Sequence, residues 1–319
     1  MEGGSTRRLP HSPTPADGEH ETYLDFTQDN LVAWDNIAEA WEQEQSRDPV
    51  LGGKVNDGND MYQQCLLPVV DELANWRPGE SVLDLGAGTG IIARLFARKG
   101  AHVTGLDFSE KMLTKGRESV KAKGFEGSVE YGYIDLMNQQ NMAEYMLGRE
   151  NAPHEGKFDL ITISTTLKSL PDLTPISEAL PSMLKPGGRI VIVDLHPAFS
   201  KPAGHRGIEI LEDPATGKQQ QNNYIKVPKY LDIPPSRSEA VRGQPEPIWL
   251  FHRPFHALLE PFFKNDLMLD AMREPAFRGE PRDLPVGQAN HNISYHNFTQ
   301  TPMLLAFRLV HRSSPGERL

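Results

Sequence analysis

A glycine-rich turn is the feature of this chain that most plainly could do chemistry. Three glycines, Gly86, Gly88 and Gly90, end the segment VLDLGAGTG, which begins with an apolar strand pattern. Glycine lets the backbone approach a ligand closely, and the helix that follows offers unpaired N–H groups. A nicotinamide dinucleotide, a nucleotide phosphate and a sulfonium cofactor all bind to a turn of this kind. The residues around the turn must therefore distinguish them.

Acidic residues occupy the ends of the next strands. Asp107 ends the second predicted strand, Asp135 ends the third, and Asp84 lies two residues before the first glycine. Ligands of open parallel sheets bind at the carboxyl ends of the strands. We therefore expect Asp107 to accept hydrogen bonds from both hydroxyls of a ribose, and Asp135 to accept one from an exocyclic amine. Asp84 disfavours a pyrophosphate and favours a cationic amino-acid group.

The spacing of the glycines separates the ligand classes further. The turn follows GxGxG rather than the GxGxxG of dinucleotide-binding proteins. No GK[ST] follows the turn, which excludes a P-loop. A dinucleotide oxidoreductase stays as an alternative that tight NAD binding would reveal.

Alternating strand and helix signals position these residues. Strands that alternate with single helices run parallel with right-handed crossovers. The predicted fold class is α/β: a Rossmann-like, doubly wound, mostly parallel seven-stranded sheet with helices on both faces. The predicted strands are residues 81–88, 102–109, 128–135, 158–164, 189–196, 267–275 and 301–312, and helices are predicted at 31–45, at 61–76 with a kink at Pro68, between the strands, and at 253–266.

The chain is predicted to form one domain with a tail and an insertion. Residues 1–22 are rich in Pro, Ser and Gly and are expected to be a disordered tail. Residues 23–319 form the domain. Within it, residues 197–250 are polar and Pro-rich, and the turn DPATG interrupts a hairpin-like pattern. Because insertions of this length in a compact domain are usually functional, we expect residues 197–250 to bind substrate or act as a lid.

Five motifs in register give the chain a family pattern. The segments VLDLGAGTG, VTGLDFS, YGYIDL, FDLITIS and LKPGGRIVIVDLHP resemble, in this order, the class I S-adenosylmethionine-dependent methyltransferases of the small-molecule and ubiquinone-pathway branch. The resemblance covers residues 34–195 and, more weakly, the last helix and strand pair. It implies S-adenosylmethionine as the cofactor and residues 23–319 as a class I methyltransferase domain.

The resemblance also assigns roles to matching residues. The glycine turn would face the methionine end of the cofactor, Asp107 the ribose, and the residues after the second and third strands the adenine. Ser164, after the fourth strand, would lie near the methionine carboxylate or the sulfonium, and Trp41 would cover the cofactor. The residues expected to bind the cofactor are Trp41, Asp84, Gly86, Ala87, Gly88, Asp107, Phe108, Met112, Asp135, Leu136 and Ser164.

Some of these residues have a structural alternative. Asp135 could cap the next helix, and Met112 and Leu136 could belong only to the core. Trp41 could pack against neighbouring helices instead of covering a ligand.

Two histidines are candidates for a general base. His196 directly follows the fifth strand, and His252 precedes the last helix, which flanks the cleft. Either could take a proton from a hydroxyl or an amine near neutral pH, or could only anchor the insertion and cap the helix. Positioning supplies effective molarities of about 10⁵ to 10⁸ M, and a general base adds about 10² to 10⁴ in rate. Methyl transfer therefore does not require a marked base.

Four histidines near the C-terminus invite a metal hypothesis, which their spacing does not support. His252, His256, His291 and His296 have no acidic or thiol ligand at a fixed spacing, and Pro254 separates the first two. We expect no metal.

The composition favours a small-molecule acceptor in the cytoplasm. The net charge of −10, without a long Lys/Arg block, disfavours nucleic acid as a partner. No apolar run approaches the roughly 18 to 20 residues that span a bilayer, so no membrane partner is expected. The lone Cys65 excludes an internal disulfide and fits a reducing, cytoplasmic compartment. The sequence leaves the oligomeric state open.

These features together predict transfer of a methyl group from S-adenosylmethionine to a hydroxyl, amine or carbon of a small organic acceptor, such as a secondary metabolite. Two alternatives keep the cofactor: a protein that catalyses another reaction, such as a cyclisation, and a non-catalytic pseudoenzyme. Aromatic residues of the insertion and the last helix could wall a pocket for an aromatic or polyketide-like acceptor, or form a local core. They are Tyr224, Tyr230, Trp249, Phe251 and Phe255.

Overall fold

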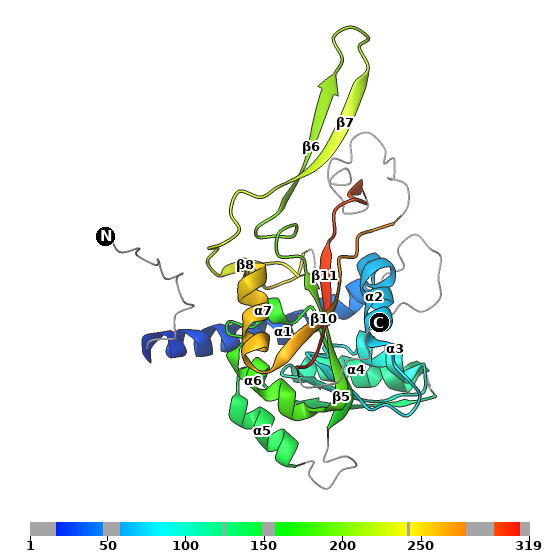
Figure 1. The fold of residues 1–319 in the computed structure, drawn as a ribbon, viewed down its shortest axis with the longest axis vertical. Helices are drawn as coiled ribbons and strands as arrows, with labels where there is room; N and C mark the ends of the chain where they lie inside the picture. Colours follow the sequence, from blue (N-terminus) through cyan, green and yellow to red (C-terminus); the bar gives the residue numbers. More distant parts are fainter. Residues whose placement is uncertain are drawn as a thin grey trace, which may run out of the picture.

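The computed structural model describes residues 17–46, 58–123, 126–148, 157–240, 243–278 and 297–312. Within these residues, a seven-stranded sheet has the order β10-β11-β5-β4-β1-β2-β3 (Figure 1). Its strands pair in parallel, except that β11 is antiparallel to both β5 and β10. The predicted fold class is therefore confirmed. The strands of this sheet are β1 (Val82–Leu85), β2 (His102–Asp107), β3 (Ser128–Tyr133), β4 (Phe158–Ser164), β5 (Leu184–Leu195), β10 (Leu267–Arg273) and β11 (Leu304–His311).

Alternating side chains of the strands build a core on each face of the sheet. In β5, Ile190 and Ile192 join a cluster with residues of α6 (Thr174–Met183) and α7 (Phe255–Lys264). Val191 and Val193 join a second cluster with residues of α2 (Leu67–Ala74) and α3 (Ile91–Ala97). Successive side chains of a strand point to opposite faces, so a strand covered by helices on both faces has a continuous apolar run. The helices that follow β1 are α3 (Ile91–Ala97), α4 (Glu110–Lys123), α5 (Gln139–Leu147), α6 (Thr174–Met183) and α7 (Phe255–Lys264).

The N-terminal helix is longer than predicted. Helix α1 (Asp17–Ser46) begins inside the segment 1–22 that we expected to be a tail, and residues 1–16 lie outside the described residues. Ala33 and Ile37 of α1 pack in one cluster with Met112 of α4. This contact holds α1 beside α4. Among the described residues, no helix combines the length and the apolar character that crossing a membrane requires.

A short π-helix precedes α2. The helix predicted at 61–76 is divided into a π-helical turn, η1 (Tyr62–Leu66), and α2 (Leu67–Ala74). Pro68 follows this turn closely, and the backbone is helical from Met61 through Leu67, so the proline lies inside a continuous helix. Because proline has no N–H to donate, the helix is irregular in the turn before Pro68 and regular after it.

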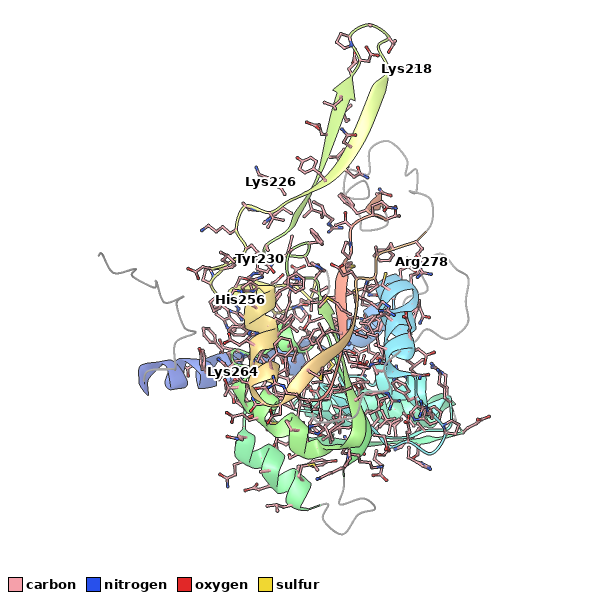
Figure 2. All side chains as sticks on the ribbon, in the orientation of Figure 1. Lys218, Lys226, Tyr230, His256, Lys264 and Arg278 are labelled. Carbon is pink, nitrogen blue, oxygen red and sulfur yellow. The ribbon has the colours of Figure 1, made fainter. Side chains whose placement is uncertain are left out.

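Two antiparallel strand pairs lie between β5 and α7, in residues 197–250, which we predicted to be an insertion. Strands β6 (His205–Glu212) and β7 (Gln219–Lys226) form an antiparallel hairpin that stands away from the sheet (Figure 1). Lys218 lies near the tip of this hairpin and Lys226 near its base (Figure 2). The predicted DPATG turn closes it, with a 2.8 Å hydrogen bond from Gly217 N to Asp213 O. Strands β8 (Ser236–Ser238) and β9 (Ile248–Leu250) form a second pair, and β9 packs against α1.

Candidate active site

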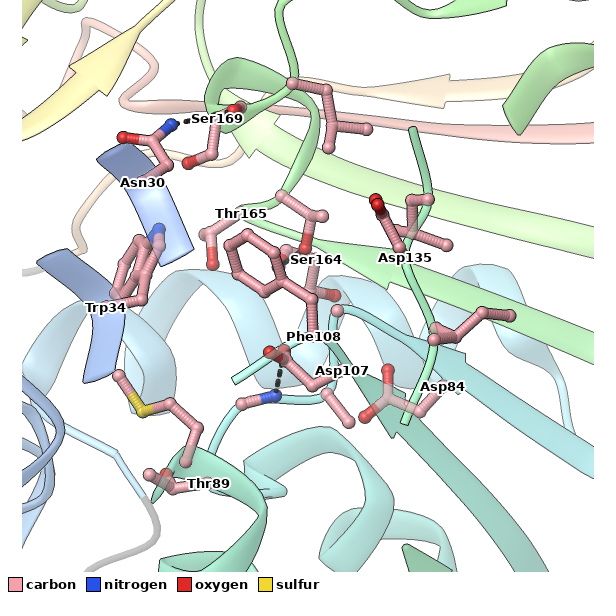
Figure 3. Close-up of a pocket in the computed structure, with 18 of the residues that line it drawn as sticks. Asn30, Trp34, Asp84, Thr89, Asp107, Phe108, Asp135, Ser164, Thr165 and Ser169 are labelled. Carbon is pink, nitrogen blue, oxygen red and sulfur yellow. Dashed lines mark hydrogen bonds between the residues drawn. The ribbon is translucent and has the colours of Figure 1, made fainter. Parts of the chain in front are cut away.

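A single pocket gathers the carboxyl ends of β1 to β4 beside α1 (Figure 3). It holds about 920 Å³ of space that protein atoms do not fill, part of it open to solvent. Every residue that the sequence predicts to bind a cofactor lines it: Trp41, Asp84, Gly86, Ala87, Gly88, Asp107, Phe108, Met112, Asp135, Leu136 and Ser164.

Asp107 is held in place by the backbone around it. Its Oδ2 accepts a hydrogen bond from Gly88 N and its Oδ1 accepts one from Ser109 N, each at 2.9 Å. Figure 3 shows the bond to the glycine turn. Burial raises the pKa of Asp107 to about 6, although these backbone hydrogen bonds act in the opposite direction. The carboxylate at the end of β2 is thus fixed against the glycine turn before any ligand arrives.

Asp84 carries an oxygen that the described residues leave unsatisfied. Its side chain is buried, and Thr162 Oγ1 donates to Asp84 Oδ1 across 2.8 Å. Among the residues that the structure describes, Asp84 Oδ2 has no hydrogen-bond partner. Burial raises the pKa of Asp84 to about 7, although hydrogen bonds from Thr162 and from the backbone of Ala93 act in the opposite direction. A buried carboxylate oxygen of this kind favours a ligand that brings a cation or a hydrogen-bond donor.

Asp135 is the third carboxylate that lines the pocket, beside Asp84 and Asp107. It lies two residues after β3, is half-buried, and accepts a 2.9 Å hydrogen bond from Met137 N. Burial raises its pKa. The neighbouring Leu136 and the facing Met112 are buried and belong to the apolar clusters. These two residues therefore line the pocket and contribute to the core.

Two glycines of the turn meet different surroundings. Gly86 has φ of 70°, and a Cβ there would lie 2.3 Å from Thr166 Oγ1. Gly88 has φ of 53°, and a Cβ there would find no atom within 4 Å. Gly86 is therefore needed for close packing of the turn against the segment after β4. Gly88 instead keeps the pocket open at the point where its N–H binds Asp107.

His196 does not line the pocket, in contrast to the predicted position at the edge of the cleft. Its Nδ1 accepts from the backbone N–H groups of Ala198 and Phe199 at 3.2 and 3.3 Å. Its Nε2 therefore carries the proton and donates to Glu274 Oε1 at 3.0 Å. The ring is buried and stacks on Phe199, and burial lowers its pKa. With both nitrogens engaged, His196 holds the start of the insertion and is not placed to serve as a base in this pocket.

His252 also lies outside the pocket lining. Its Nε2 donates to Tyr230 O across 2.6 Å, and its buried Nδ1 has no partner among the described residues. Burial lowers its pKa. The described residues contain no cluster of His, Cys, Asp and Glu suited to a metal ion. His291 and His296 lie outside the described residues.

None of the aromatic residues proposed as pocket walls lines this pocket. Trp249 and Phe251 contact Phe26 of α1, with ring centroids 4.9 and 5.3 Å apart. Tyr230 Oη accepts a 2.9 Å hydrogen bond from Phe255 N, and Tyr224 is exposed on the hairpin. Apart from the exposed Tyr224, these residues make local contacts with α1 and with the start of α7.

The sequence did not reveal the part of the pocket formed by Asn30, Tyr62 and Thr165. Asn30 of α1 is buried, and its Nδ2 donates to Ser169 O at 2.9 Å and to Trp249 O at 3.1 Å. Its Oδ1 accepts from Trp249 N at 2.7 Å. Asn30 therefore joins α1, β9 and the turn after β4 at one point. The only local signal is a polar residue on the apolar side of a helix, which is too common to identify a site.

The strand order and the pocket at the strand ends are those of a class I methyltransferase fold. Residues 77–228 match the family model described as a methyltransferase domain. This part of the chain is therefore identified as a methyltransferase domain, and the resemblance to the class I S-adenosylmethionine-dependent methyltransferases is confirmed.

Individual relatives agree with this assignment. The chain is 35% identical, over 134 residues, to the ubiquinone/menaquinone biosynthesis C-methyltransferase UbiE of Teredinibacter turnerae. This match covers 41% of this chain and 47% of that protein. The chain is also 33% identical, over 130 residues, to the ubiquinone biosynthesis O-methyltransferase of Cronobacter sakazakii, covering 41% and 48%. The chain thus spans about half the length of these curated relatives. The CcbJ methyltransferase of Streptomyces caelestis shares the fold, with a TM-score of 0.51, 17% identity, and coverage of 88% of this chain and 98% of that one.

Proposed function

We propose that this chain is an S-adenosylmethionine-dependent methyltransferase that moves a methyl group to a hydroxyl, amine or carbon of a small organic acceptor. The observation that carries this proposal is the convergence of Asp84, Asp107 and Asp135 on one pocket together with the glycine turn (Figure 3). These carboxylates come from the ends of three neighbouring strands. Asp84, two residues before the glycine turn, makes a pyrophosphate unfavourable there and a cationic group favourable.

The residues present fit this cofactor. The unsatisfied Asp84 Oδ2 suits the ammonium of the methionine moiety, and the fixed carboxylate of Asp107 suits the two ribose hydroxyls. Asp135 suits the exocyclic amine of the adenine, with the other pocket residues after β2 and β3 as apolar neighbours of the base. Trp41 lines the pocket, and its proposed role is to cover the cofactor. When bound, S-adenosylmethionine supplies an electrophilic methyl group on a sulfonium.

The chain's own contribution to catalysis is then positioning and exclusion of water. Among the described residues that line the pocket, no Lys, Arg or His is present, and the acidic side chains are the three assigned to the cofactor. Alignment of two bound reactants supplies effective molarities of about 10⁵ to 10⁸ M. Methyl transfer in this pocket therefore depends on the fixed geometry of its walls.

The methyl acceptor and the cellular compartment can be specified further. The curated relatives are named as a C- and an O-methyltransferase of quinone biosynthesis, which supports a small organic acceptor and leaves the acceptor atom open. We infer a secondary-metabolite acceptor, bound from the side of the inserted segment 197–250. The single, buried Cys65 supports a reducing, cytoplasmic compartment.

Calorimetric titration with S-adenosylhomocysteine and with NAD tests the proposal. We expect saturable binding of S-adenosylhomocysteine and no binding of NAD, because the buried Asp84 lies beside the glycine turn, where a pyrophosphate would bind. Binding of NAD alone would overturn the proposal in favour of the oxidoreductase alternative. Binding of S-adenosylhomocysteine without methyl transfer to any acceptor would favour a cyclisation-type reaction or a pseudoenzyme.

A further inference from the structure

Two hydroxyl groups from distant parts of the chain meet in the wall of the pocket. Tyr62 Oη lies 3.4 Å from Thr165 Oγ1, although the two residues are separated by 103 positions. Both residues line the pocket, and neither belongs to the set assigned to the cofactor. Thr165 directly follows Ser164 at the end of β4, close to Phe108 (Figure 3).

Each of these residues sits on an irregular backbone. Tyr62 begins the π-helical turn η1, and Thr165 has φ of 53°, a left-handed conformation that β-branched residues rarely adopt. π-Helical turns and strained residues occur preferentially at functional sites, because the surrounding structure must compensate for their cost. Thr165 N is held by a 2.7 Å hydrogen bond to Val193 O of β5. Two independent irregularities thus present one pair of hydroxyls.

The contact between the hydroxyls of Tyr62 and Thr165 does not use all of their hydrogen-bonding capacity. A hydroxyl–hydroxyl hydrogen bond usually spans about 2.7–2.8 Å, so 3.4 Å leaves room for a third polar group to bind both. The adjacent Ser164 Oγ, which we expect to lie near the methionine carboxylate or the sulfonium of the cofactor, is buried and has no partner among the described residues. The wall therefore offers hydrogen-bonding capacity that the described residues do not use.

The charge of this region limits what can bind. Tyr62 is buried, and its burial, together with the carboxylates of Asp84 and Asp194, raises its pKa to about 12. The phenol therefore keeps its proton at neutral pH and can donate a hydrogen bond. No cation among the described residues lines the pocket, whereas carboxylates do, so a carboxylate or phosphate on the acceptor would be repelled.

We propose that the hydroxyls of Tyr62 and Thr165 bind an uncharged protic group of the methyl acceptor, such as an alcohol, a phenol or a neutral amine. This inference rests on the proposed function and specifies its acceptor. Tyr62 and Thr165 hold the group that receives the methyl, and the residues assigned to the cofactor hold S-adenosylmethionine. Because carboxylates and no cations line this pocket among the described residues, an acceptor with an anionic group near its reacting atom should bind more weakly.

The test uses protein saturated with S-adenosylhomocysteine and two matched probes, phenol and benzoate, with binding followed by ligand-observed NMR titration. We expect phenol to bind saturably and benzoate to bind at least tenfold more weakly. Tyr62→Phe and Thr165→Val should each weaken phenol binding about three- to tenfold, the effect of one lost hydrogen bond. Thr165→Ser keeps the hydroxyl and should restore most of the affinity. Tyr224→Phe, which changes an exposed tyrosine on the hairpin, is the control and should have no effect.

The affinity for S-adenosylhomocysteine, measured by calorimetry on each variant, separates this inference from the proposed function. It should be unchanged in Tyr62→Phe and Thr165→Val. Three results would overturn the proposed role of the Tyr62 and Thr165 hydroxyls: no binding of phenol, equal binding of phenol and benzoate, or phenol binding that the substitutions leave unchanged. Loss of S-adenosylhomocysteine affinity in Tyr62→Phe would assign the residue to the cofactor instead. Failure of the unmodified protein to bind S-adenosylhomocysteine would contradict the proposed function itself.

Discussion

The backbone N–H of Gly88 donates to Asp107 Oδ2 across 2.9 Å. This bond ties the glycine turn after β1 to the carboxylate that ends β2. Two residues 19 positions apart therefore form one rigid unit at the carboxyl ends of β1 and β2. Because the carboxylate is fixed before a ligand binds, it can receive two hydroxyl groups without further ordering, which lowers the entropic cost of binding.

Substitution of Asp107 tests this unit. In Asp107→Ala, affinity for S-adenosylhomocysteine should fall about tenfold to a hundredfold, because hydrogen bonds to a charged group are lost. The fold should persist, since Asp107 is itself an unfavourably buried carboxyl whose pKa is raised to about 6. Calorimetry measures the affinity and circular dichroism the fold. Asp213→Ala, in the exposed hairpin turn, is the control, and an unchanged affinity in Asp107→Ala would show that the ribose lies elsewhere.

The pH dependence of binding tests Asp84. Burial raises the pKa of Asp84 from 3.8 to about 7. Between these two pH values, the folded protein without ligand therefore binds more protons than the unfolded chain. The unfolding free energy contributed by Asp84 is therefore present at low pH and is lost as pH rises from about 4 to about 7. A bound ammonium favours the carboxylate, so binding of S-adenosylhomocysteine should release a proton and strengthen as pH rises through about 7.

Calorimetry in buffers of different ionisation enthalpy measures this proton release. Asp84→Asn should abolish it. Methylthioadenosine, which lacks the amino-acid part, should bind without it in the unmodified protein. Equal proton release for both ligands would place the ammonium away from Asp84.

The two glycines of the turn should respond differently to alanine. Gly86→Ala should lower the unfolding free energy by more than the about 1–2 kcal/mol of left-handed strain, because its Cβ would lie 2.3 Å from Thr166 Oγ1. Gly88→Ala carries the strain alone, since no atom lies within 4 Å of its Cβ. Its methyl would instead enter the pocket and reduce the affinity for S-adenosylhomocysteine. Urea unfolding and calorimetry measure the two effects, and equal destabilisation by both substitutions would contradict the account.

Asn30 should act as a clamp for the pocket wall. Asn30→Ala removes three hydrogen bonds and leaves backbone groups of Trp249 and Ser169 unpaired, which should cost about 1–3 kcal/mol in urea unfolding. Hydrogen exchange of the Trp249 amide should accelerate. Asn36→Ala is the matched control, because Asn36 lies on the same helix and makes a single exposed bond to Glu246. If the Trp249 amide exchanges its hydrogen at the same rate in both variants, Asn30 does not hold β9 to α1.

The sheet and the carboxylate positions could be predicted because they follow from local patterns. A buried parallel strand has a continuous apolar run, and the residue after it lies at the common edge of the sheet whatever the connecting helix does. Asp84, Asp107 and Asp135 therefore line one pocket as their strand positions indicated. The same logic does not determine where a side chain points once the strand has ended. His196 follows β5 and turns into the protein, where two backbone N–H groups and Glu274 engage its ring.

The remaining features depend on contacts between distant residues. Asn30 meets Trp249 across 219 positions, and Tyr62 meets Thr165 across 103. Neither pair has a sequence motif. The left-handed backbone at Thr165 is also unexpected, because a threonine gives no signal for it.

Transfer of a labelled methyl group tests the central claim most directly. The protein is incubated with S-adenosylmethionine carrying a labelled methyl and with an extract of small molecules, and label in the small-molecule fraction is measured by chromatography. The account predicts a labelled product that forms with the unmodified protein and is lost in Asp107→Ala. Tight binding of S-adenosylhomocysteine with no label in any small molecule would contradict it.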